Sequence, residues 1–164
     1  TDEQFEDVKA YVAALKEVHP IRLTALVALL ENRSDGRDGI QGAINVVNNR
    51  IKSTAYPNSE REVIFAPNQF ESIPNINDKT KVTQAIYKNF MDVMTAKKGD
   101  KILGKLYNDA ITDAIAINSG ELADNTDGAD LFANMSKLKT VPSYLKGRVA
   151  AKKIGETSYF KSSD

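Results

Sequence analysis

Glu31 is the residue whose type and position best suit chemistry, because it closes the apolar run of residues 23–30. The run predicts a buried helix, and Gly36 and Gly39 mark its end just beyond. Apolar neighbours and the negative end of the helix dipole both disfavour an ionised carboxylate, so we expect a raised pKa for Glu31. A carboxylic acid that keeps its proton near neutral pH can act as a general acid. The alternative is a helix-end glutamate that simply reaches solvent.

Composition excludes several other kinds of site. The 164 residues include one His and no Cys, which makes a His-based metal cluster, a thiolate site or a Ser-His-Asp triad improbable. We therefore expect no metal and no other cofactor. The 22 basic and 22 acidic residues cancel, so no overall field favours nucleic acid. The longest apolar run is too short to span a bilayer, and the polar, acidic start does not resemble a signal peptide.

Charge is nevertheless unevenly placed along the chain. Every charged residue from Asp109 to Asp130 is acidic, and every charged residue from Lys137 to Lys153 is basic. One interpretation is a pair of solvated faces that attract each other. The other is a basic rim that faces an anionic polymer.

The elements that must position Glu31 are mainly helical. A capping box at Thr1 and Gln4 opens a first helix, and a second runs from Pro20 to Glu31. Apolar residues at helical spacing predict further helices over 38–53, 60–65, 78–94 and 100–117, with Asp38, Asp78 and Asp100 as N-caps. Residues 129–134 and 154–160 read as short extended segments. We predict one domain over 1–164 of the mainly α (α+β) class, a lysozyme-like helical body with a small β flap.

Several blocks of sequence then match one known family in order. These are the segment 31–36 (ENRSDG), the segment 39–43 (GIQGA), the segment 46–50 (VVNNR), the segment 56–59 (YPNS) and the segment 67–70 (PNQF). Downstream follow the segments 124–129 (DNTDGA), 131–134 (LFAN) and 154–160 (IGETSYF). Together they resemble the bacterial cell-wall hydrolases typified by the spore cortex-lytic enzyme, over about residues 23–160. The chain departs from the family pattern at Asn125, Met135 and Thr157, where Pro, Pro and His are usual.

The resemblance implies cleavage of the glycan strand of peptidoglycan between N-acetylmuramic acid and N-acetylglucosamine. Ordinary glycoside hydrolysis needs two carboxylates, and the nearest candidates are Asp35 and Asp38. Asp35 reads better as a loop residue and Asp38 as a helix cap. We therefore favour the lytic transglycosylase reaction for which the family is known, with Glu31 alone as acid and then base. A hydrolytic muramidase (lysozyme) is the alternative.

Four further residues match family positions and are predicted to bind the substrate. Gln69 offers both a donor and an acceptor to an N-acetyl group, and Asn134 is expected near the sugar. Phe70 could stack on a sugar face or fill the core. Asn49 is placed with this group, although it and Arg50 could instead hold the loop after Glu31.

The partner implied by the resemblance is the peptidoglycan glycan strand, met in the periplasm or outside the cell. Without a signal peptide, release through a holin or carriage in a phage particle would bring the protein to the wall, as an endolysin or with virion components as partners. A hypothesis from a different class is a catalytically idle relative that binds glycan or serves as a structural virion protein.

Overall fold

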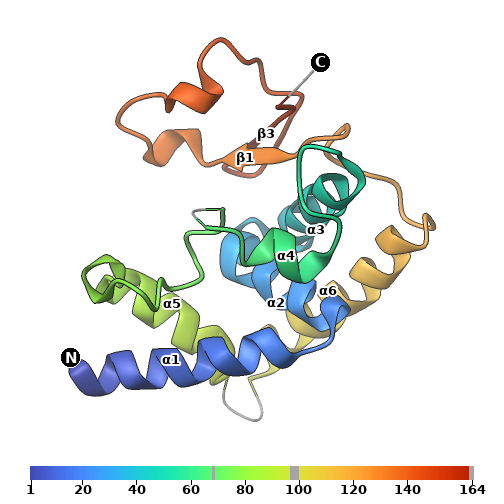
Figure 1. Ribbon diagram of the computed structural model, residues 1–164. Coiled ribbons are helices and arrows are strands. Elements are labelled where there is room, and N and C mark those ends of the chain that lie inside the picture. The colour runs from blue at the N-terminus through green and yellow to red at the C-terminus, as the bar shows by residue number, and fades with distance from the viewer. Residues whose placement is uncertain (68, 97–99, 163–164) are drawn as a thin grey trace.

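The computed structural model describes residues 1–67, 69–96 and 100–162, and shows a helical body with a small antiparallel sheet above it (Figure 1). The body contains α1 (Asp2–Glu17), α2 (Pro20–Asn32), α3 (Gly36–Lys52), α4 (Glu60–Ile64), α5 (Gln84–Met94) and α6 (Lys101–Asn118). The sheet contains β1 (Leu131–Ala133), β2 (Lys152–Ile154) and β3 (Thr157–Phe160). The predicted mainly α class with a β flap is confirmed. None of the described helices is both long and apolar enough to cross a membrane.

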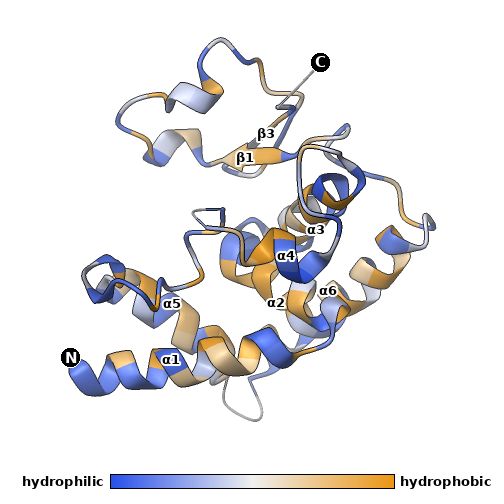
Figure 2. Ribbon diagram, in the orientation of Figure 1, coloured by the Kyte–Doolittle hydropathy of each residue, from blue (hydrophilic) through white to orange (hydrophobic). Residues whose placement is uncertain are grey.

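Helix α2 is the centre of the body. It packs against α3, α4, α5 and α6, which explains why its sequence is apolar on nearly every side (Figures 1 and 2). Its buried residues are Leu23, Thr24, Ala25, Val27, Ala28, Leu29, Leu30 and Asn32. His19 caps its start, because the ring Nδ1 accepts a hydrogen bond from the Ile21 amide, and Pro20 occupies the first turn. The predicted buried helix leading to Glu31 is therefore confirmed.

Two predicted helix starts were wrong. The helix that follows Glu31 starts at Gly36 with Asp35 as its N-cap, so Asp38 lies inside the first turn. A short 3-10 turn, Arg33–Asp35, joins α2 to it, and Gly36 supplies the positive φ of 72° that ends that turn. Asp78 caps only the 3-10 turn Lys79–Lys81. Thr83 caps α5 through a hydrogen bond from the Ile86 amide to its hydroxyl.

The sheet has the strand order β1-β3-β2, with both pairs antiparallel. The predicted extended segment 154–160 is in fact the turn and second strand of a hairpin, because Gly155 with a φ of 58° reverses the chain there. All four residues of β3 are buried. Tyr159 of that strand packs with Val46 of α3 and Ala129 in a small second core between helix and sheet.

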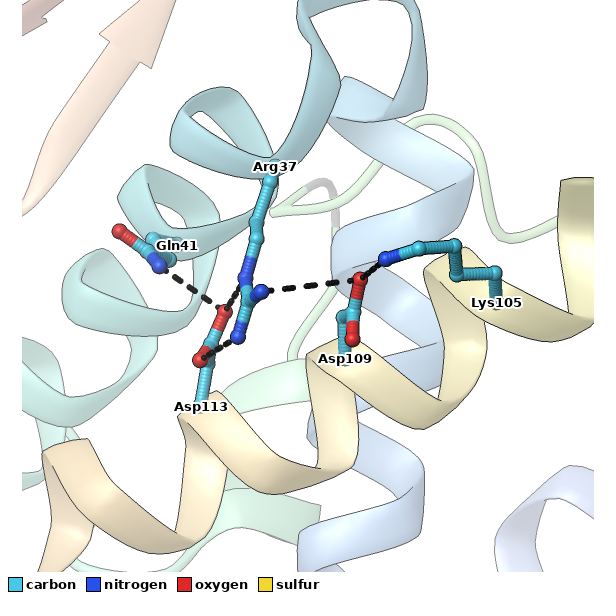
Figure 3. A network of polar contacts seen from close by, with 5 residues as sticks. All are labelled: Arg37, Gln41, Lys105, Asp109 and Asp113. Atoms are coloured by element: carbon cyan, nitrogen blue, oxygen red, sulfur yellow. Dashed lines mark hydrogen bonds and ion pairs between the residues drawn. The ribbon is translucent and has the colours of Figure 1, made fainter.

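A polar network joins α3 to α6 on the side of the body (Figure 3). Two nitrogens of the Arg37 guanidinium donate to the two carboxylate oxygens of Asp113, at 2.9 and 2.8 Å, and Gln41 Nε2 donates to the same carboxylate at 2.9 Å. These bonds, led by that of Arg37, hold the pKa of Asp113 below its ordinary value. Asp109 extends the network to Lys105 on α6, with a separation of 2.7 Å. The network fixes the start of α3, which follows the 3-10 turn Arg33–Asp35.

Candidate functional site

Glu31 lies in the last turn of α2 and is only partly exposed. Its pKa is raised to about 7, from an ordinary value of 4.5, mainly by burial and also by the negative charge of Glu71. The hydroxyl and backbone N–H of Ser72 face the carboxyl and act in the opposite direction, as does the positive charge of Arg50. A carboxyl group with a pKa raised in this way can hold or release its proton near neutral pH, which suits a group that first gives and then takes a proton.

Glu71 and Ser72 supply two of the groups that act on Glu31, and the sequence alone did not single out either of them. Glu71 is exposed, whereas the Ser72 hydroxyl is buried and makes no well-aligned hydrogen bond within the described residues. The described residues of the connection from 65 to 78 contain only turns and bends, so no periodicity in the sequence indicates which of its side chains point toward α2. Their position next to Gln69 and Phe70 in a family motif was the only available signal.

Arg50 is a buried cation close to this site. Its guanidinium lies between the rings of Tyr56 and Phe70, with its carbon 5.2 and 5.0 Å from the two ring centroids. Its Nε donates to the Asp130 carbonyl at 2.8 Å and its Nη1 to Gln69 Oε1 at 3.3 Å. Only 4% of its surface is exposed, and within the described residues it has no carboxylate in ion-pair contact. The cation therefore acts on Glu31 through space, and aromatic faces and neutral oxygens hold it in place.

The four predicted substrate-binding residues occupy different environments. Gln69 is exposed and keeps its amide nitrogen free of hydrogen bonds within the described residues, whereas Asn68 beside it lies outside them. Phe70 is buried in the main core, 6.3 Å from the Phe132 ring, which fits the core-filling alternative. Asn134 is half-buried, and its Oδ1 caps a short turn by accepting from the amide and the hydroxyl of Ser136.

Asn49 serves the loop before the sheet. Its Nδ2 donates to Asp124 Oδ2 at 2.8 Å and to the Ala129 carbonyl at 2.9 Å. Asp124 in turn accepts from Thr126 and from the Gly128 amide. These contacts fit the alternative that Asn49 holds a loop, and they use both protons of its amide nitrogen. A glycan contact from this residue stays a prediction.

The two aspartates considered as second carboxylates have other positions or partners in the structure. Asp35 accepts from the Glu156 amide through Oδ1 at 3.1 Å and from the Thr157 hydroxyl through Oδ2 at 2.6 Å. It thereby fastens the β2–β3 hairpin to the turn after Glu31, and Thr157 at the family's His position has a structural use. Asp38 is exposed, one turn inside α3. The acid that acts electrostatically on Glu31 is instead Glu71.

Residues of the segment 64–77 line a groove of about 480 Å³. Val12 and Lys16 of α1, the end of α4 and Ile86 of α5 form its walls, and Phe70 and Glu71 lie at its edge. It therefore reaches the residues that precede Ser72. The described residues contain no group of three or more His, Cys, Asp or Glu placed to hold a metal ion.

Comparison with known proteins shows the family of the chain. The model of the family described as Cell Wall Hydrolase matches residues 34–160. The chain belongs to the cell wall hydrolase family. The match begins three residues after Glu31, at the turn that Asp35 fastens to the hairpin. No curated protein shows significant similarity to the chain.

Among solved structures, the catalytic domain of the Bacillus cereus SleB protein is similar in fold. The TM-score is 0.55 at 23% sequence identity, and the alignment covers 87% of this chain and 89% of that domain. The predicted resemblance to the family of the spore cortex-lytic enzyme is confirmed. As a member of this family, the protein is a cell wall hydrolase, and its substrate class is peptidoglycan.

Proposed function

We propose that the protein cleaves the glycan strand of peptidoglycan between N-acetylmuramic acid and N-acetylglucosamine as a lytic transglycosylase, with Glu31 as its single catalytic acid and base. The observation that carries the proposal is the partly buried Glu31 carboxyl, whose pKa of about 7 lets it hold or release a proton near neutral pH. Membership of the cell wall hydrolase family supports the substrate class.

The reaction needs one proton donor that becomes the proton acceptor. Glu31 donates its proton to the glycosidic oxygen as the bond from that oxygen to the muramyl C1 breaks. The muramyl 6-hydroxyl then bonds to C1 and gives its proton to the Glu31 carboxylate, which restores the starting state. Proximity of the 6-hydroxyl replaces an activated water. Arg50 and Ser72 favour the ionised form of Glu31 between the two steps.

Gln69 and Asn134 are proposed to bind the sugar, and their hydrogen bonds support this role. Each has an amide nitrogen without a hydrogen bond within the described residues, while its amide oxygen is held by Arg50 or Ser136. An amide fixed through its oxygen presents its N–H groups in a defined direction, which suits an N-acetyl or hydroxyl oxygen.

The test of the proposal is the structure of the products. Lytic transglycosylation of purified sacculi should release muropeptides that end in 1,6-anhydromuramic acid, lighter by one water than hydrolytic products and without a new reducing end. Glu31→Gln should lower the rate by at least about 100-fold and keep the fold, because Gln is nearly isosteric and carries no transferable proton. A variant that still clears sacculi at the wild-type rate would exclude Glu31 as the acid.

A second candidate is a hydrolytic muramidase, and the position of Glu71 favours it. Glu71 is close enough to raise the pKa of Glu31 and is exposed at the edge of the groove, where a carboxylate could activate water. Products with free reducing ends, together with a Glu71→Gln variant as inactive as Glu31→Gln, would establish that mechanism. Zymography on cell walls would separate both enzymes from a non-catalytic glycan-binding virion protein of the same fold.

A further inference from the structure

The connection between β1 and β2 carries a concentrated positive charge. We name residues 137–153 the cationic loop. Its basic residues, all exposed, are Lys137, Lys139, Lys146, Arg148, Lys152 and Lys153, and no acidic residue interrupts them. Figure 1 shows this connection extending from the sheet, away from most of the helical body. In a chain without net charge, such a local excess creates a field of its own.

The acidic stretch 109–130 does not neutralise this loop. Asp109 and Asp113 face Arg37 and Lys105, Asp124 accepts hydrogen bonds within its own turn, and Asp130 accepts from Ser162. None of the ion pairs within the described residues includes a basic residue of the cationic loop. Glu156 is the nearest acid along the chain, and its carboxylate faces Ser136 at 3.4 Å. The interpretation of two faces that attract each other finds no support in these contacts.

The cationic loop is also a formed surface. The side chain of Leu145 is buried at its centre. Arg148 closes its base by donating to the carbonyls of Tyr144 at 3.0 Å and Lys161 at 2.6 Å. Apolar side chains stand exposed between the basic ones, with 55% of Tyr144 and 89% of Val149 accessible to solvent.

The strands on either side of the cationic loop contact segments that lie next to Glu31 in the sequence or in space. At one end, Phe132 of β1 packs against Phe70, two residues before Ser72. At the other end, Asp35 holds the β2–β3 turn to the residues that follow Glu31. One extended polymer can therefore contact both the cationic loop and the segments next to Glu31.

We propose that the cationic loop binds the carboxylates of the peptide stems of peptidoglycan while the glycan strand lies at Glu31. This inference rests on the proposed substrate. The sugars of the strand offer the loop little charge, whereas stem peptides end in carboxylates and recur along the strand. Several lysines that meet several carboxylates give a salt-sensitive attraction, and the aliphatic parts of the loop pack on the stems.

Binding is measured with the inactive Glu31→Gln chain, so that the sacculi stay intact. The test variant carries Lys→Gln at positions 137, 139, 146, 152 and 153, and leaves Arg148 in place because it holds the loop. The matched control carries Lys→Gln at five exposed body positions, 9, 52, 88, 101 and 105, and so loses the same charge. We expect the test variant to bind sacculi at least about tenfold more weakly and with less dependence on salt, and the control to bind within about twofold of the parent.

Two treated forms of the wall and one lipid surface identify the anion. Binding should survive hydrofluoric acid treatment, which removes phosphodiester polymers, and should fall to the level of the test variant on glycan stripped of its stems by an amidase. Equal binding to stripped glycan, loss after the acid treatment, or a loop-dependent preference for anionic phospholipid vesicles over sacculi would each overturn the proposal. With Glu31 restored, the test variant should cut short uncharged glycan at the parental rate, which separates failure of this proposal from failure of the proposed activity.

Discussion

Asn32, the residue after Glu31, donates its side-chain amide to the phenol oxygen of Tyr159 at 3.0 Å and thereby joins the end of α2 to the central strand of the sheet. The same nitrogen donates to the Gly39 carbonyl at 3.2 Å. Both side chains are buried, with 3% of Asn32 and none of Tyr159 exposed. The backbone that carries the Glu31 carboxyl is therefore fixed from the sheet side as well as from within the helical body.

Removal of the phenol oxygen should weaken this junction. Tyr159→Phe leaves the buried Asn32 amide with one partner, so we expect a loss of about 1 to 2 kcal/mol in the free energy of unfolding. Tyr144→Phe, at a half-exposed ring in the cationic loop, should change it by less than about 0.5 kcal/mol. Urea denaturation of the two variants measures the difference. Equal stabilities would mean that the Asn32 bond contributes nothing net.

Gly42 tests how closely the sheet approaches α3. A Cβ at this position would collide with the phenol oxygen and ring carbons of Tyr159, whereas a Cβ at Gly104 in α6 would meet no atom within 4 Å. Gly42→Ala should therefore cost about 1 to 3 kcal/mol through overpacking. Gly104→Ala should be neutral or stabilise by up to about 1 kcal/mol, because alanine suits a helix better. Thermal denaturation checks the opposite signs, and a stable Gly42→Ala protein would show that the sheet can move away.

The sequence predicted the body better than the site. Helix α2 could be predicted because its apolar run and its Pro20 start are local signals, and Glu31 was conspicuous as the only charge at its end. The helix starts at Asp35 and Thr83 were missed because Asp38 and Asp78 are equally good capping residues by type. Only the positions of neighbouring elements decide which of two such residues begins a helix.

The groups that tune Glu31 depend on tertiary contacts that no local pattern contains. Ser72 and Glu71 lie in a connection whose described residues form only turns and bends, and Arg50 was predicted only as a residue that could hold the loop after Glu31. Its burial between Tyr56 and Phe70 depends on three segments that meet in space. Family resemblance located the segment 67–70 near the site but could not say that Phe70 faces the core.

Glu31→Gln should change stability in a pH-dependent way. The folded-state pKa of about 7 lies above the ordinary 4.5, so the contribution of Glu31 to stability is fully present below pH 4.5 and is lost as the pH rises from 4.5 to 7. Gln removes this loss. The variant should therefore be more stable than wild type by up to about 3 kcal/mol at pH 8 and nearly equal at pH 4. Melting temperatures at the two pH values provide the check, and an equal difference at both would contradict a raised pKa.

Ser72 and Glu71 should shift the pH dependence of activity in opposite directions. Activity that needs protonated Glu31 falls as the pH rises through its pKa, and the alkaline limb of kcat/KM reports that value for the free enzyme. Ser72 lowers the pKa of Glu31, so Ser72→Ala should move the limb to higher pH. Glu71 raises that pKa, so Glu71→Gln should move the limb to lower pH, by less at high salt because Glu71 is exposed. Ser119→Ala at the end of α6 is the control and should leave the limb in place. Rates on soluble muropeptide oligomers between pH 5 and 9 measure the three limbs, and shifts of the same sign in the two site variants would mean that another group titrates there.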